Sequence, residues 1–192
     1  MKSLYHAICI WLLVFALLQF YAENFIYIDS VLMQQPWRLL TAHWVHVGWA
    51  HYALNMMALL CLPLVLPHFQ IRWLLLTIFI LPIPLSLMFY GLYPDVQAYA
   101  GFSGVLHGLY TVAAIKCFAI AKERKFCMVI LFGIALKLCW EATVGPSSVT
   151  AAWIGSAVMV EAHAWGVFMG VCLVLVAWIL QQFKFNWHNS LK

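Results

Sequence analysis

Long apolar segments separated by short polar loops alternate along the whole chain. Each apolar segment is about 20 residues long, which matches the roughly 30 Å hydrocarbon core of a bilayer. The pattern predicts six membrane-spanning helices, over residues 4–22, 39–62, 73–90, 102–121, 126–144 and 154–180. Pro82 and Pro84 are expected to kink the third of them. The chain is therefore predicted to be an all-α membrane protein, with one transmembrane domain over residues 1–192.

The composition excludes several classes of protein. Hydrophobic residues make up 66% of the 192 residues and charged residues 8%, whereas soluble domains carry roughly 25% charged residues. The few basic residues form no stripe on a solvated face, so nucleic acid is not an expected partner. The six cysteines contain no C-x-x-C pair and indicate neither a zinc site nor a disulfide framework. No metal and no cofactor is expected.

The basic residues predict how the helices are oriented. Most of them fall at the chain ends or in the even-numbered loops: Lys2, Arg72, Lys122, Arg124, Lys125, Lys184 and Lys192. The odd-numbered loops offer only Arg38. By the positive-inside rule, both termini are expected to be cytoplasmic, in a chain whose surroundings are the lipid bilayer.

In this orientation the second, fourth and sixth helices all run from the outer to the inner side. Their outer halves contain five polar or ionisable side chains: His46, His51, Ser103, His107 and His163. Such groups are costly at membrane depth and usually face a functional interior. Their shared depth predicts a polar site below the outer surface.

Small residues predict that the fourth and sixth helices pack closely. Two stripes at helical spacing are formed by Gly101, Gly104 and Gly108 on one helix, and by His163, Gly166 and Gly170 on the other. Faces of small residues let helix backbones approach each other. The approach would bring Ser103 within hydrogen-bonding reach of His163, as a serine nucleophile and its base require.

Glu161 does not fit as the acid of a triad. It lies two residues before His163, so the two side chains point about 200° apart on a helix. A Ser–His dyad without an acid is therefore expected, with His163 neutral at working pH. A loop-like start to the sixth helix would weaken the objection to Glu161 and leaves it as an alternative acid.

The remaining polar residues leave alternatives open. His51 and Asn55 are four residues apart and share a helix face, where they could form an oxyanion site or a simple interhelical hydrogen bond. His43 and His46 could hold a metal or a haem, although no acidic or cysteine ligand accompanies them at short spacing.

Four motifs together resemble those of the rhomboid intramembrane serine proteases, in order and over nearly the whole chain. They are Trp37–Arg38, His46-x4-His51-x3-Asn55, Gly101-x-Ser103-Gly104, and Ala162–His163 followed by Gly166 and Gly170. The resemblance implies a rhomboid-like bundle of six transmembrane helices and an endopeptidase activity.

The resemblance also implies roles for individual residues. Ser103 would be the nucleophile and His163 its general base. His51, Asn55 and the Ser103 backbone N–H would form the oxyanion hole, and His46 would help to keep the outer cavity wet. In the family an aromatic residue often stacks on the catalytic histidine, one turn after the serine.

In this chain His107 occupies that position. The first loop is also short, so the family's membrane-embedded hairpin between the first two helices would be reduced. The run of residues 101–108, the E-A-H-A segment at residues 161–164 and the bare six-helix core are similar to the rhombosortase branch of bacteria. That similarity implies transmembrane substrates with a C-terminal tail: a Gly-Gly-type motif, a hydrophobic helix and a basic end. It also implies a bacterial inner membrane, with the site open to the periplasmic side. Release of the product by hydrolysis or by transfer to an amine stays open, and a non-catalytic binder of transmembrane helices is the alternative.

Overall fold

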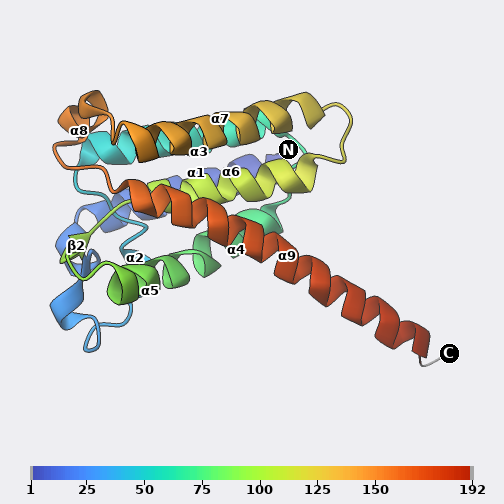
Figure 1. Cartoon of the computed structure of the whole chain (residues 1–192), viewed down its shortest axis with the longest axis horizontal. Coiled ribbons are helices and arrows are strands. Elements are labelled where there is room, and N and C mark those ends of the chain that lie inside the picture. The colour runs from blue at the N-terminus through green and yellow to red at the C-terminus, as the bar shows by residue number, and fades with distance from the viewer. Residues whose placement is uncertain (1, 191–192) are drawn as a thin grey trace.

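A computed structural model describes residues 2–190 and shows a helical bundle (Figure 1). The helices are α1 (Lys2–Gln19), α2 (Arg38–Thr41), α3 (Trp49–Val65), α4 (Ile71–Ile80), α5 (Pro82–Leu92), α6 (Ser103–Cys117), α7 (Arg124–Thr143), α8 (Ser148–Ile154) and α9 (Val160–Ser190). The loops contain the 3-10 turns Ala22–Asn24 and Asp29–Val31, and the strands β1 (Tyr27–Ile28) and β2 (Ala98–Tyr99). Met1 and residues 191–192, at the ends of the predicted domain, lie outside the described residues.

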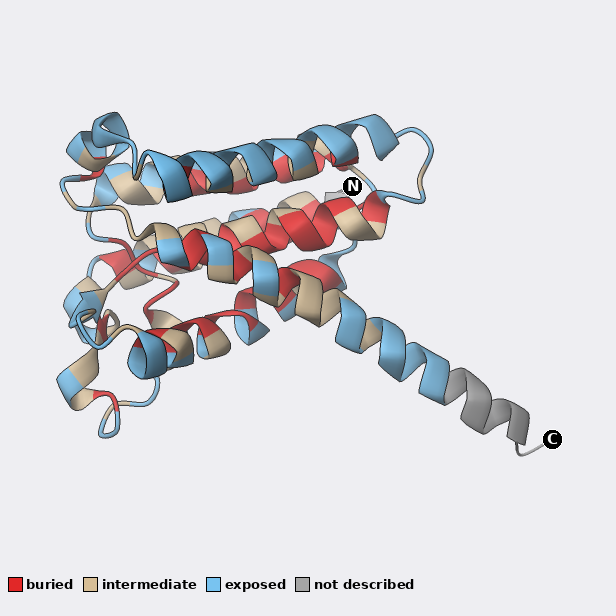
Figure 2. Ribbon diagram, in the orientation of Figure 1, coloured by how far each residue is buried: buried red, intermediate tan, exposed pale blue. Residues whose placement is uncertain are grey.

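Helix α6 is the buried centre of the bundle (Figure 2). It packs most extensively on α9 and also contacts α7, α4 and α3. Val105, Leu109 and Val112 are fully buried along it. Ser103 is the first residue of α6, so the serine lies at one end of this core.

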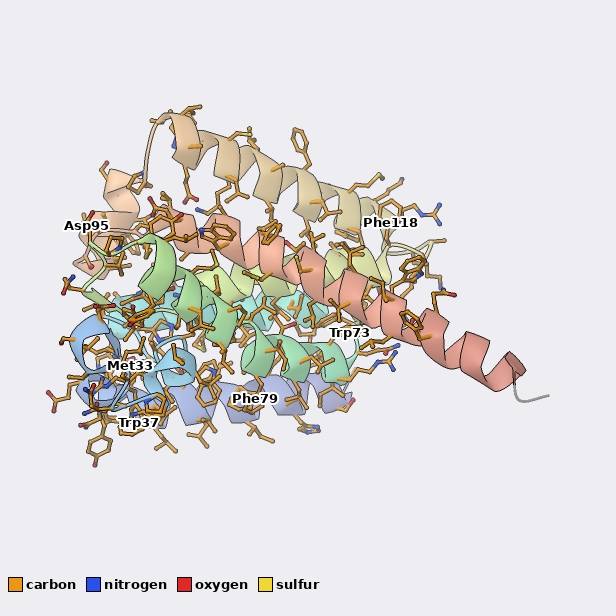
Figure 3. All side chains as sticks on the ribbon, turned by 60° about the horizontal axis from the view of Figure 1, so that its bottom comes forward. Met33, Trp37, Trp73, Phe79, Asp95 and Phe118 are labelled. Carbon is orange, nitrogen blue, oxygen red and sulfur yellow. The ribbon has the colours of Figure 1, made fainter. Side chains whose placement is uncertain are left out.

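The outer surface is apolar, as expected of an integral membrane protein. Within residues 2–190, three segments are long and apolar enough to cross a membrane: Ile71–Leu92, Arg124–Thr143 and Val160–Phe183. Ser3–Gln19 and Trp49–Val65 are apolar but shorter. Large side chains such as Phe79 and Phe118 are partly exposed on the surface (Figure 3), and exposure of so much apolar surface is typical of a lipid-facing protein.

The prediction of one continuous helix over residues 39–62 is wrong, because a loop over residues 42–48 separates α2 from α3. The backbone of that loop finds partners outside a helix. The His46 N–H donates to Gln19 Oε1 at 2.7 Å, and Gln19 Nε2 donates to the His46 carbonyl at 2.8 Å. The Ala42 carbonyl accepts from the Gly101 N–H at 3.0 Å. With these groups satisfied elsewhere, the helical ladder is not required there.

The third helix is interrupted where its prolines were expected to kink it: α4 ends at Ile80, and Pro82 is the first residue of α5, where a proline needs no N–H partner. The two parts form one apolar segment, Ile71–Leu92. The sixth was expected to begin at residue 154, but α9 begins at Val160. Ile154 instead ends α8, a short helix that the sequence did not predict, and Gly155 follows it at φ 71°.

Two short strands add a small element to the predicted all-α class. Tyr27 pairs with Tyr99, and Ile28 with Ala98, in an antiparallel ladder. The ladder ties the first loop to the segment that leads into α6, and so helps to fix the backbone just before Ser103.

Arg38 holds the first loop together from inside. Its side chain is buried, and its guanidinium donates to the carbonyls of Glu23 at 3.0 Å and Ile26 at 2.6 Å, and to Gln35 Oε1 at 2.6 Å. The neighbouring Trp37 is half exposed, and its indole N–H donates to the Asn24 carbonyl at 3.3 Å. Both residues act on the loop rather than at the serine.

Arg38→Ala is expected to destabilise the protein by about 3 kcal/mol or more, because it removes the hydrogen bonds that a charged, buried donor makes to Glu23, Ile26 and Gln35. For a chain of this size, that corresponds to a fall of roughly 6–12 °C in the melting temperature. Thermal unfolding in detergent measures it. Arg72→Ala removes an exposed arginine and is the matched control, expected to change stability by only about 0.5 kcal/mol. Equal melting temperatures for the two variants would contradict this role of Arg38.

Candidate active site

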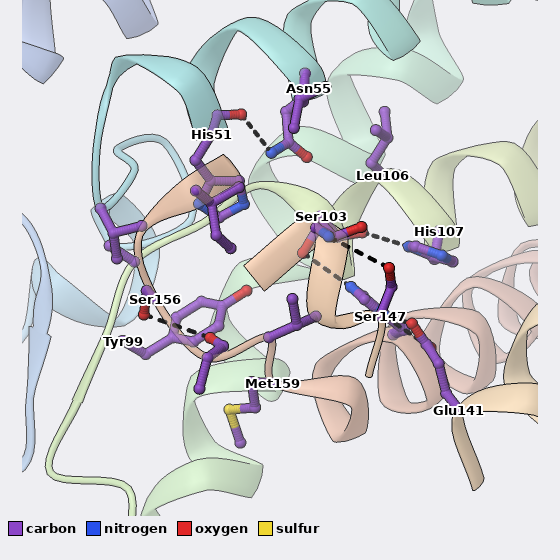
Figure 4. A pocket seen from close by; sticks show the side chains of 18 of the residues that line it. His51, Asn55, Tyr99, Ser103, Leu106, His107, Glu141, Ser147, Ser156 and Met159 are labelled. Carbon is purple, nitrogen blue, oxygen red and sulfur yellow. Dashed lines mark hydrogen bonds and ion pairs between the residues drawn. The ribbon is translucent and has the colours of Figure 1, made fainter. Parts of the chain in front are cut away.

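A cavity of about 610 Å³ lies at the end of the bundle where α6 begins. It is lined from α3, α6, α7 and α9, and by the loops around β2 and α8 (Figure 4). Its polar and ionisable lining includes His51, Asn55, Tyr99, Ser103, His107, Lys137, Glu141 and His163. Its size is typical of a binding site for a small ligand or a peptide segment.

Ser103 and His163 meet in this cavity. The Ser103 Oγ and His163 Nε2 are 3.1 Å apart, although 60 residues separate them in sequence. His163 is buried, at 3% exposure. The structure therefore brings together the hydroxyl and the imidazole that the sequence pairs.

Glycines make that meeting possible. A Cβ added at Gly104 would lie 2.8 Å from the Ala162 carbonyl oxygen, and one at Gly170 would lie 2.7 Å from that of Gly108. A Cβ at Gly166 would overlap the Gly104 carbonyl oxygen. No larger residue fits at these positions without moving a backbone, so the small residues set the distance between α6 and α9.

Gly101 has a separate role in front of the serine. Its φ is +156°, and a Cβ there would lie 2.8 Å from Cε1 of His51. Only glycine fits both the backbone conformation and the close approach of the imidazole. The turn into α6 therefore packs directly against His51.

Glu141 is the site residue that sequence reasoning missed. Its carboxylate oxygens lie 2.9 and 3.1 Å from His163 Nδ1, and the same carboxylate forms an ion pair with Lys137. Glu161, the acid considered from the sequence, is exposed on α9. The available signal was a lysine and a glutamate four residues apart in an otherwise apolar helix, a costly pair at membrane depth.

His107 occupies the place of a stacking aromatic residue. Its ring is 4.2 Å from that of His163, with an angle of 22° between the planes. Its Nδ1–H donates to the Ser103 carbonyl at 2.7 Å, since a carbonyl can only accept. His107 thus covers the face of His163 and does not compete with it for the serine hydroxyl.

His51 and Asn55 line the cavity from α3. The Asn55 side-chain amide donates to the His51 carbonyl at 2.9 Å, within its own helix. The His51 Nδ1 is buried and has no hydrogen-bond partner among the described residues. Both side chains are close enough to the serine to share its cavity, and neither is bonded to Ser103.

His46 lies behind His51, with ring centroids 5.0 Å apart. Burial, with a smaller contribution from His51, lowers the pKa of His46 to about 3, so this loop histidine is neutral at physiological pH. Tyr99, on β2, lines the cavity wall, and burial raises the pKa of its hydroxyl well above the usual range. It is a neutral phenol, and it donates to the Gly101 carbonyl at 2.8 Å.

The histidine pair considered as a metal or haem site is not assembled as one. His43 Nε2 lies 3.0 Å from Ser86 Oγ, and this contact joins the loop over residues 42–48 to α5. Within residues 2–190, no group of three or more His, Cys, Asp or Glu side chains is arranged to hold a metal ion.

Comparison with known families agrees with the motifs in the sequence. The profile of the Rhomboid domain matches residues 33–180, a range that includes every candidate site residue named above. No curated protein and no solved structure matches the chain.

Proposed function

Because this chain belongs to the rhomboid family, whose members are generally serine intramembrane proteases, we propose that it is an intramembrane serine endopeptidase. Ser103 is the nucleophile and His163 is its general base. The observation that carries the proposal is the 3.1 Å contact between Ser103 Oγ and His163 Nε2 in a cavity large enough for a peptide segment.

The proposed reaction is acyl transfer at a substrate peptide bond. As Ser103 Oγ attacks the carbonyl carbon, His163 Nε2 takes its proton; the C–N bond then breaks, and His163 returns the proton to the leaving amine. Water attacks the acyl-enzyme, releasing a carboxylic acid and restoring Ser103. An amine in place of water would give a new amide instead.

His51, Asn55 and the Ser103 backbone N–H are the proposed donors to the oxyanion. The support is that both side chains line the serine's cavity and that Gly101 lets His51 approach the start of α6. In the free protein Asn55 donates within α3, so it would exchange that bond for the oxyanion as substrate binds.

His51→Ala and Asn55→Ala are each expected to lower turnover by about 10²–10³ and to leave measurable activity, since other donors to the oxyanion remain. Initial rates of substrate cleavage measure the effect. His6→Ala, an exposed histidine on α1, is the control and should cleave at the wild-type rate. Full activity in both oxyanion variants would contradict the assignment.

The proposed topology has six spans, a single domain over residues 1–192, cytoplasmic termini and a site open to the outer side of a bacterial inner membrane. Two observations support it. Ser103 begins α6, whereas Lys122, Arg124 and Lys125 follow its other end. In Figure 1, α1 begins at the same end of the bundle as the turn between α6 and α7. Basic residues near that turn favour the cytoplasm.

Members of the family act on transmembrane substrates in a bilayer. The proposed substrates here are surface-protein precursors with a C-terminal Gly-Gly-type motif, a hydrophobic helix and a basic end. This rests on the similarity of residues 101–108 and 161–164, and of the bare six-helix core, to the rhombosortase branch.

Reconstitution with a designed reporter tests the proposal. One reporter carries the complete tail, and a second has Val-Val in place of Gly-Gly. The expected result is truncation of the first reporter at the motif, with a product mass that distinguishes a free acid from an added amine. If both reporters stay intact but bind the protein, the chain is a non-catalytic binder. Equal cleavage of both reporters would contradict the proposed specificity for the Gly-Gly motif, but not the protease activity.

A further inference from the structure

We propose that Glu141 is a positioning residue for His163, so that Ser103, His163 and Glu141 form a hydrogen-bonded triad. This inference rests on the proposed function, because it concerns how the proposed base is held. It was not expected from the sequence, which predicted a dyad without an acid.

The geometry fixes the protonation of the imidazole. Glu141 approaches Nδ1 with both carboxylate oxygens, at 2.9 and 3.1 Å, while Nε2 faces Ser103 Oγ. An ionised carboxylate can only accept, so Nδ1 carries the hydrogen. The Nε2 lone pair is then directed at the serine hydroxyl, as a general base requires.

The position of Glu141 on α7 indicates a role beyond packing. Within Arg124–Thr143, all of it described, the two buried side chains are Cys127 and Glu141, and most others face outward. A charge is costly to bury without partners. Lys137 is 45% exposed and reaches the cavity. The need to neutralise its charge therefore does not by itself explain why a carboxylate is buried at position 141.

Several charged or titratable groups face His163. Glu141 and Lys137 come from α7, His107 from α6 and His51 from α3. Of these, Glu141 alone stabilises the protonated imidazole that forms when His163 takes the serine proton. Loss of its charge should therefore slow the reaction.

Labelling with a fluorophosphonate measures this directly on the full-length, reconstituted protein. Ser103 Oγ bonds to phosphorus, the P–F bond breaks, fluoride leaves, and His163 takes the hydroxyl proton. Glu141→Gln is expected to slow labelling by about 10²–10⁴ at neutral pH. Glu141→Asp should restore part of the rate. Glu161→Gln changes an exposed glutamate two residues before His163 in the sequence, and it should behave as wild type.

A double variant separates positioning from charge neutralisation. If Glu141 served only to neutralise Lys137, then Lys137→Met combined with Glu141→Gln would label at the wild-type rate and overturn the inference. Positioning predicts that the double variant stays as slow as Glu141→Gln. Thermal unfolding confirms that each variant is folded. An unlabelled wild type would instead refute the proposed function, whereas a labelled wild type and an unchanged Glu141→Gln would refute this inference alone.

Discussion

Ser103→Ala is expected to leave a folded protein with no detectable cleavage. The substitution removes the atom that attacks the peptide bond, and loss of a nucleophile in serine hydrolases typically costs about 10⁶ in turnover. The hydroxyl contributes little to the fold, because its hydrogen-bond partner is the His163 imidazole at 3.1 Å. Cleavage of the reporter and the melting temperature should therefore respond differently.

His163→Ala is expected to have an effect of the same size, since nucleophile and base act as one unit and their losses are not additive. Ser148→Ala, an exposed serine on α8 next to the site, is the matched control and should retain wild-type cleavage. Cleavage by Ser103→Ala at more than a trace level would mean that another residue performs the reaction.

Gly166→Ala is the second change with a large expected effect. The added methyl group would overlap the Gly104 carbonyl oxygen, so α6 and α9 must move apart. Overpacking of this kind costs about 1–3 kcal/mol. A shift of about 1 Å at the Ser103–His163 contact would lower activity by about 10². Cleavage rate and melting temperature should fall together.

Gly133→Ala provides the comparison for that variant. A Cβ at Gly133, in the middle of α7, meets no atom within 4 Å, and alanine is the better helix former. This variant should be at least as stable as wild type and fully active. If Gly166→Ala behaved in the same way, the close packing of α6 on α9 would not be what holds the two residues together.

The contact between α6 and α9 could be predicted because its information is local. Glycine spacing at Gly104, Gly108, Gly166 and Gly170 marks one face on each helix, and small residues in apolar helices favour close packing. Ser103 and His163 lie on or beside those faces. Spacing along two helices was therefore sufficient to pair residues 60 positions apart.

The loop over residues 42–48 could not be predicted in the same way. Its residues are apolar or aromatic enough to continue a helix, and the partner that satisfies the His46 backbone is Gln19, 27 residues earlier. Apolar periodicity carries no information about a side chain that replaces a helical hydrogen bond from elsewhere in the fold. The division of α2 from α3 is a tertiary effect.

Glu141 was missed for a different physical reason. Helix α7 is mostly exposed, so its apolar residues mark no inward face from which the direction of Glu141 could be inferred. The polar residues that share one depth were sought on the helices predicted to run inward from the outer side, whereas α7 runs the other way and brings its C-terminal end to the same depth. An acid in an apolar helix, with a lysine four residues before it, was the available clue.

Mass spectrometry of the fluorophosphonate-treated protein shows whether Ser103 is the nucleophile and depends on His163. We expect one adduct, on Ser103, in the wild-type protein, and no adduct in His163→Ala. An adduct on another residue, equal labelling without His163, or an unmodified wild-type protein would contradict the pairing of Ser103 with His163 as nucleophile and base.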